Sequence, residues 1–192
     1  MRRHPQLVAA GLAAALAGCT FADRVGVIRH DTLTDAQQVI ANTKINAGDM
    51  TIEGVVDRAD TSYAAGQPIT VSVKVSKDAH VAILRVLANG DTAILFPNKK
   101  HPKSDIKADT VLTVPGPDDP VTIAVDKPGV VLLEFIASTA GDSWLFSRKS
   151  DEGSDFAGLG TTTRALAKDI TGSLKINHGP QTAATYLTIR IE

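Results

Sequence analysis

The sequence predicts a mainly β protein, namely an immunoglobulin-like or related antiparallel β-sandwich with one or two short helices. Short apolar runs recur from about residue 60 onward, and residues typical of turns separate them. Only two segments have the spacing or the capping residues of a helix. Many short strands with few helices favour two packed antiparallel sheets.

Two segments alternate strictly between apolar and polar residues. In the first, residues 69–75, the apolar side chains are expected to share one buried face: Ile69, Val71, Val73 and Val75. The second is residues 186–192, at the end of the chain. We expect this terminal strand to be paired within the sheet, so that truncating it unfolds the domain.

Buried strands and their turns follow from apolar runs and from Gly and Pro. Residues 81–87 are almost continuously apolar, and Asn89-Gly90 supplies the positive φ angles of a tight hairpin turn before a partner strand at 92–96. Residues 130–137 are expected to form another buried strand. Three prolines between 115 and 120 cannot lie within a strand and therefore separate expected strands at 111–114 and 121–125.

Two segments are expected to be helical. Thr34 and Gln37 have the spacing of a capping box, which predicts a short helix through residue 40. Residues 163–174 predict one amphipathic helix with apolar side chains at helical spacing: Leu166, Ile170 and Leu174.

The first 18 residues have the layout of a secretory signal peptide, with a basic start, an apolar run at 7–16 and small residues before Cys19. That run is shorter than the roughly 20 residues of a membrane-spanning helix, so an uncleaved anchor is a weaker alternative. A plain secretory leader with an incidental cysteine is another. Leu16-Ala17-Gly18-Cys19 resembles the lipobox of bacterial lipoproteins, in which the cysteine sulfur receives a diacylglyceryl group and the new amine is acylated.

The resemblance to lipoproteins implies a location and a domain organisation. In Gram-negative lipoproteins an Asp after the cysteine retains the protein at the inner membrane, so Thr20 and Phe21 imply the cell outer membrane, with the periplasmic side favoured. We expect residues 1–18 to be the signal peptide, 19–60 a lipidated and partly ordered tether, and 61–192 the β-sandwich domain.

The composition gives no indication of an enzyme, a cofactor, a metal site or nucleic-acid binding. The formal net charge is −1, and Cys19 is the only cysteine, so an internal disulfide is excluded. No serine lies in a G-x-S-x-G elbow, and the acidic turn at 151–155 matches no complete calcium loop. The histidines outside the leader do not have metal-ligand spacing: His30, His80, His101 and His178.

Two features are candidates for an interaction. Lys99, Lys100, His101 and Lys103 form the strongest local positive patch, which could meet an acidic partner or a lipid A phosphate. The alternative is a solubilising loop whose basic residues protect an apolar strand. Trp144, the lone tryptophan, could anchor a partner, and packing in the core is its alternative.

Residues 63–138 resemble the bacterial domain-of-unknown-function family 4384, which occurs alone in envelope lipoproteins and also appended to larger bacterial proteins. The resemblance implies no established activity. The matching segments are Tyr63-Ala64-Ala65-Gly66, Val81-Ala82-Ile83-Leu84, Asn89-Gly90-Asp91, Leu95-Phe96-Pro97-Asn98, Val114-Pro115 and Ile136-Ala137-Ser138.

These observations predict a non-enzymatic outer-membrane lipoprotein, an accessory or scaffold module that docks onto an envelope or secretion-complex protein. The alternative is a glycan- or small-ligand-binding lipoprotein, for which Trp144, Tyr63 or Tyr186 would provide a stacking surface. A hydrolase or metalloenzyme would require distant polar residues to converge in the fold.

Overall fold

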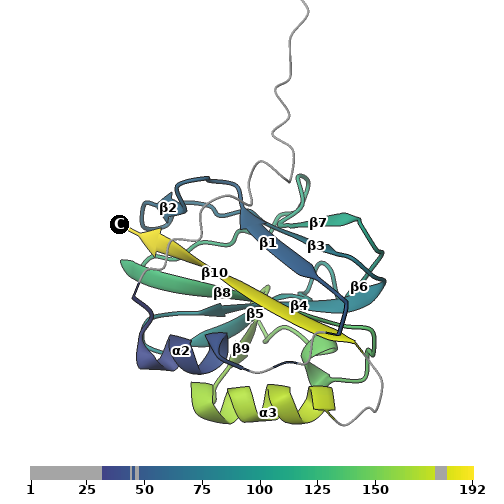
Figure 1. The fold of residues 1–192 in the computed structure, drawn as a ribbon. Helices are drawn as coiled ribbons and strands as arrows, with labels where there is room; N and C mark the ends of the chain where they lie inside the picture. Colours follow the sequence, from purple (N-terminus) through teal and green to yellow (C-terminus); the bar gives the residue numbers. More distant parts are fainter. Residues whose placement is uncertain (1–31, 44, 46–47, 176–180) are drawn as a thin grey trace, which may run out of the picture.

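The computed structural model describes residues 32–43, 45, 48–175 and 181–192. The expected leader, Cys19, the first part of the expected tether, His30 and His178 lie outside the described residues. Figure 1 shows three layers: a small sheet, a large sheet, and two helices on the face of the large sheet that points away from the small one. The predicted mainly β sandwich is confirmed.

The small sheet is antiparallel and has the order β1 (Ile52–Val56), β3 (Val71–Val75), β7 (Val111–Val114). All three valines of β3 are buried, as the alternation predicted. The expected strand at 121–125 is wrong, because this segment makes a single bridge, Ile123 to Ile69. Pro68 has no N–H to continue the ladder beside it.

The large sheet runs in the order β2, β10, β8, β4, β5, β9, and β6 pairs with β4. Its neighbouring strands are antiparallel except for the parallel pair β2 and β10. The predicted terminal strand is confirmed, and so is the pairing of the predicted hairpin. The turn differs from the prediction, because Gly90 has a positive φ angle and Asn89 does not. The bounds are β2 (Ser62–Tyr63), β4 (Ala79–Val86), β5 (Thr92–Phe96), β6 (Asp105–Ile106), β8 (Gly129–Ser138), β9 (Ala157–Leu159) and β10 (Thr182–Ile191).

Both faces of the large sheet are buried, which explains why its central strands read as continuous apolar runs. In β8, Leu133 and Phe135 pack between the two sheets. Leu132 and Ile136 point the other way and pack under the helices. A strand between two apolar layers therefore lacks the alternation that marks β3.

Both predicted helices are present: α2 (Asp35–Ala41) and α3 (Thr163–Lys175). Thr34 caps α2 in the expected capping box with Gln37. Leu166 and Ile170 of α3 are buried against the sheet, with Leu174 partly buried beside them. Within the described ranges, no helix is long and apolar enough to cross a membrane.

The folded unit begins earlier than the expected boundary at residue 61. Ile40 of α2 is buried in the layer under the large sheet, and β1 pairs with β3 along its whole length. Met50 is buried between the sheets. The residues that pair with these segments lie far along the chain; Ile52, for instance, lies opposite Val75. The residues adjacent in the sequence therefore do not indicate that these segments belong to the folded unit.

Gly54 of β1 gives a first testable prediction. A methyl group at this position would overlap the ring of Phe135, which is fully buried. We expect Gly54→Ala to lower the free energy of unfolding by about 1–3 kcal/mol through overpacking. Urea denaturation measures the change.

The same substitution at Gly172 is the matched control. Nothing lies within 4 Å of the added methyl group, and the residue is inside α3. Gly172→Ala should therefore raise the stability by about 0.5–1 kcal/mol, as expected for a helix interior. Equal effects of the two substitutions would contradict the close contact between β1 and β8.

Candidate functional site

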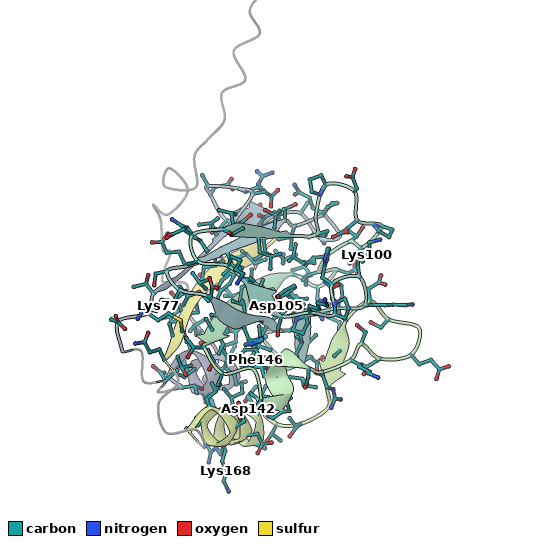
Figure 2. The ribbon with its side chains drawn as sticks, turned by 90° about the vertical axis from the view of Figure 1, so that its right-hand side faces the viewer. Lys77, Lys100, Asp105, Asp142, Phe146 and Lys168 are labelled. Carbon is teal, nitrogen blue, oxygen red and sulfur yellow. The ribbon has the colours of Figure 1, made fainter. Side chains whose placement is uncertain are left out.

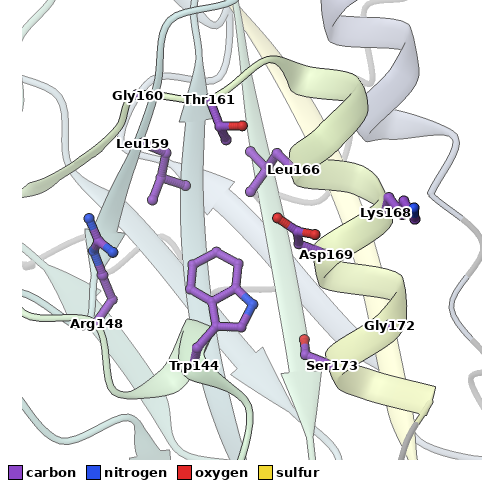
Figure 3. Close-up of a pocket in the computed structure, with 10 residues that line it drawn as sticks. All are labelled: Trp144, Arg148, Leu159, Gly160, Thr161, Leu166, Lys168, Asp169, Gly172 and Ser173. Atoms are coloured by element: carbon purple, nitrogen blue, oxygen red, sulfur yellow. The ribbon is translucent and has the colours of Figure 1, made fainter.

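A cavity of about 730 Å³ lies between α3, β9 and the short 3₁₀ helix η1 (Trp144–Phe146). We call it the Trp144 cleft. Figure 3 shows the indole at one end, with Leu159 and Leu166 at the other. Its remaining lining residues are charged, hydroxylated or small: Arg148, Gly160, Thr161, Lys168, Asp169, Gly172 and Ser173.

The position of the indole follows from the fold of η1. Ser143 caps η1, since its Oγ accepts the Leu145 N–H at 3.3 Å, and the same Oγ lies 2.9 Å from Ser173 Oγ of α3. Leu145 and Phe146 turn into the core and are buried. Trp144 is left half-buried and lines the cleft.

Opposite charges flank the indole. In Figure 3 the guanidinium of Arg148 lies on the side of β9, and the carboxylate of Asp169 projects from α3, the side on which the indole nitrogen lies. Both residues are exposed, and neither has an ion-pair partner within the part of the chain that the structure describes. The cleft therefore offers an aromatic face, a cation and an anion to a ligand.

A second cavity, of about 660 Å³, lies between the loop that follows β5 and the segment that follows η1. We call it the Lys99 cavity. Lys99 and Lys103 come from the first wall, and Arg148 and Lys149 from the second. Arg148 lines both cavities. Figure 2 shows this face, on which the lining residues Asp105 and Phe146 lie near the middle.

The structure separates the five predicted interaction residues. Lys99 and Lys103 line the Lys99 cavity, and Trp144 lines the Trp144 cleft. Lys100 is exposed and is not part of either lining. His101 Nε2 lies 2.7 Å from Asp119 Oδ2, and it too is outside both linings.

The Asp119 carboxylate is held in its charged form by its neighbours. The Gly116 N–H donates to Asp119 Oδ2 at 2.7 Å, and with the His101 contact this lowers the pKa of Asp119 below its usual value. This arrangement joins the basic loop to the proline-rich turn at 115–120. His101 is therefore a structural residue of the loop.

Of the three aromatic residues expected to offer a stacking surface, Trp144 lines a cavity and Tyr63 is excluded. Tyr63 is buried, and its hydroxyl donates to Asp57 Oδ1 at 2.8 Å. Burial and the Asp57 contact raise the pKa of Tyr63. Tyr186 packs against the apolar layer under the helices. The expectation that Tyr63 stacks on a ligand is therefore wrong.

Sequence reasoning missed Arg148, Lys149 and Asp169. The available signal for the first two was a dibasic pair one residue after the apolar end of η1, separated from it by Ser147. Asp169 lies on the polar side of α3, three residues after Leu166, and nothing in the sequence marks it as facing a tryptophan.

The described histidines and carboxylates do not converge on a metal. Within the described ranges, no group of three His, Cys, Asp or Glu residues could hold a metal ion. His80 Nδ1 lies 3.1 Å from Ser104 Oγ. In the acidic turn, Asp151 Oδ2 accepts the Gly158 N–H at 2.7 Å, so this carboxylate protects the free edge of β9.

Residues 62–140 match a family described as "Domain of unknown function (DUF4384)". This confirms the domain inferred from the sequence. No curated protein and no solved structure matches the chain. The matched segment begins at β2 and ends just after β8, so it contains Lys99 and Lys103. The elements that form the Trp144 cleft, η1, β9 and α3, follow it in the chain.

Proposed function

We propose that this protein is a non-enzymatic binding module of the cell envelope, tethered to a membrane by acyl groups on Cys19, and that it binds a glycan in the Trp144 cleft. The observation that carries the proposal is the half-buried indole in a cavity of about 730 Å³. A concave site with apolar walls and a few polar groups is the usual form of a small-ligand site.

The lining suits a sugar ring. The C–H face of a sugar packs well on an indole, and its hydroxyl groups donate to a carboxylate such as that of Asp169 or accept from a guanidinium such as that of Arg148. The hydroxyl groups of Thr161 and Ser173 offer further hydrogen bonds. Because Arg148 and Asp169 lack ion-pair partners among the described residues, a ligand would not have to displace an internal salt bridge.

Docking onto an envelope protein finds less support from the described surface. Stable protein interfaces have an apolar centre, and exposed apolar patches mark them. Val111, which is 43% exposed, is the one large exposed hydrophobic residue within the described ranges. The described surface therefore fits a small ligand bound in a cleft better than a protein partner bound to an exposed apolar patch.

Binding in the cleft is tested by thermal shift and calorimetry with soluble muropeptides, chito-oligosaccharides and malto-oligosaccharides. A ligand at about 100 times its dissociation constant should add about 2.7 kcal/mol of stability. We expect Asp169→Asn to weaken binding about tenfold or more, equivalent to about 1.4 kcal/mol, without changing the unliganded stability. Asp169 is exposed, so its substitution is not expected to disturb the core.

Asp118→Asn is the matched control, because Asp118 is also exposed but lies in the proline-rich turn far along the chain from α3. Trp144→Phe, which keeps an aromatic face, should retain more affinity than Trp144→Ala. Equal binding by wild type, Asp169→Asn and Trp144→Ala would exclude the cleft as the site.

The tether is tested separately by metabolic labelling with radioactive palmitate. We expect the wild-type protein to incorporate label and to fractionate with membranes, and Cys19→Ala to lose the label, because the thiol is the acceptor of the diacylglyceryl group. Outer-membrane and inner-membrane fractions separated by density would test the proposed outer-membrane location. Equal labelling of Cys19→Ala would contradict the anchor.

A further inference from the structure

The Lys99 cavity holds four cationic side chains on two facing walls. Lys99 and Lys103 belong to one wall, and Arg148 and Lys149 to the other. Across the described residues, none of the four has a carboxylate within ion-pair distance. By contrast, Lys74, Lys77 and Lys107 elsewhere on the surface are each paired with an aspartate.

Backbone and side-chain hydrogen bonds hold the two walls in place. Asn98 is buried, and its Oδ1 accepts the N–H groups of Lys100 and His101 at 3.0 and 2.8 Å, which closes the loop that carries Lys99. The Lys99 N–H donates to the Asp155 carbonyl at 3.2 Å and so joins the first wall to the second. The cations therefore project from a fixed frame.

The lining also contains three carboxylates, Asp105, Asp151 and Glu152. They form no ion pair with the four cations within the described part of the chain. Asp151 Oδ2 accepts the Gly158 N–H, so Asp105 and Glu152 are the carboxylates of the lining that are more open to a ligand. Compact ammonium groups suit a phosphate, whose several oxygens can contact more than one cation at once. Carboxylates beside them suit hydroxyl donors on the rest of the same ligand.

We propose that the Lys99 cavity binds a phosphorylated polyol, with the phosphate at the four cations and the hydroxyl groups at the acidic residues. The same chemistry occurs in a soluble glycerol phosphate and in the glycerol phosphate headgroup of a lipid. The site is distinct from the Trp144 cleft, although Arg148 lines both, and it does not depend on the function proposed for that cleft.

The test is calorimetry on the full chain in a non-ionic detergent, with sn-glycerol 3-phosphate and dihexanoyl phosphatidylglycerol as the two added ligands. We expect Lys99→Glu/Lys149→Glu, which reverses one charge on each wall, to weaken binding about tenfold or more. Added salt should weaken the wild-type interaction, because these cations are exposed. If both ligands bind, the site accepts the soluble phosphate ester and the lipid headgroup. If only dihexanoyl phosphatidylglycerol binds, the site recognises the headgroup of a lipid.

The matched control is Lys100→Glu/Lys127→Glu, which changes the net charge equally at two exposed lysines outside the cavity. It should bind like the wild type. If the two double variants lost the same amount of affinity, the effect would come from the overall charge and the proposal would be overturned. A failure of both ligands to bind the wild type would also overturn it. Circular dichroism is the check that each variant is folded.

Discussion

Gln37→Ala should destabilise the protein by about 2–4 kcal/mol, because it removes three hydrogen bonds of a buried amide, each contributing about 0.5–1.5 kcal/mol. Gln37 is fully buried, and its Nε2 donates to the carbonyls of Val86 and Val130 at 3.1 and 2.8 Å. Its Oε1 accepts the Thr34 N–H at 3.1 Å. One side chain thus caps α2 and joins it to the ends of β4 and β8.

The neighbouring residue provides the control. Gln38 is exposed and donates to the Leu33 carbonyl, so Gln38→Ala should change the stability by no more than about 0.5 kcal/mol. Urea denaturation followed by circular dichroism measures both variants. If Gln37→Ala were as stable as Gln38→Ala, α2 would not be docked on the sheet by this amide, and the folded unit would begin later than we describe.

Glu134→Gln should remove a pH dependence of stability of up to about 1.4 kcal/mol per pH unit, the value for one proton. Glu134 lies in the middle of β8, is 2% exposed, and faces the apolar layer under the helices beside Leu132 and Ile136. Its Oε2 has no hydrogen-bond partner among the described residues. Burial raises the pKa of Glu134 well above the usual value of 4.5.

The raised pKa fixes the direction of the effect. Between the usual pKa and the raised one, the folded protein keeps the proton on Glu134 while the unfolded chain releases it. The higher proton affinity of Glu134 in the folded state therefore contributes fully to the stability at acidic pH. This contribution is lost as the pH rises through the raised pKa. We expect wild type to lose stability relative to Glu134→Gln as the pH increases from about 5 to about 8.

Glu53→Gln is the control for this experiment. Glu53 is exposed on β1, so its substitution tests whether any exchange of Glu for Gln produces the same change. Urea denaturation of the three proteins across the pH range gives the comparison. A constant difference between wild type and Glu134→Gln at every pH would mean that Glu134 is ionised in the folded protein or that it reaches solvent.

The strands with local signals could be predicted from the sequence. The alternation around Val73, the Asn89-Gly90 turn and the apolar run before Ser138 each depend on neighbours in the chain, and each predicted strand is present. The short strands β2, β6 and β9 were missed. They consist of two or three residues and are defined by distant partners, as in the pairing of β9 with β5.

The candidate site was only partly predictable for a related reason. The sequence marks Trp144 as the lone tryptophan and the basic loop as a patch, but a cleft exists only once η1, β9 and α3 are packed together. The contact between Ser143 and Ser173 joins residues that are 30 positions apart. Neither serine has a property that identifies such a contact in advance.

The match to the family and the position of the cleft together suggest a division of roles along the chain. Residues 62–140 provide most of the two-sheet frame, whereas the helical layer and the Trp144 cleft come from segments outside this range. We expect the frame to be shared with other proteins that match the family, and the ligand preference to depend on residues such as Arg148 and Asp169.

The most direct test of glycan binding in the Trp144 cleft is the indole N–H signal in a nitrogen-15 NMR titration. The chain contains one tryptophan, so this signal needs no assignment by mutation. With a glycan that raises the melting temperature, we predict a saturable shift of the indole signal in the wild type and a shift at higher ligand concentration in Asp169→Asn. An indole signal that does not move while that glycan binds would contradict the proposal.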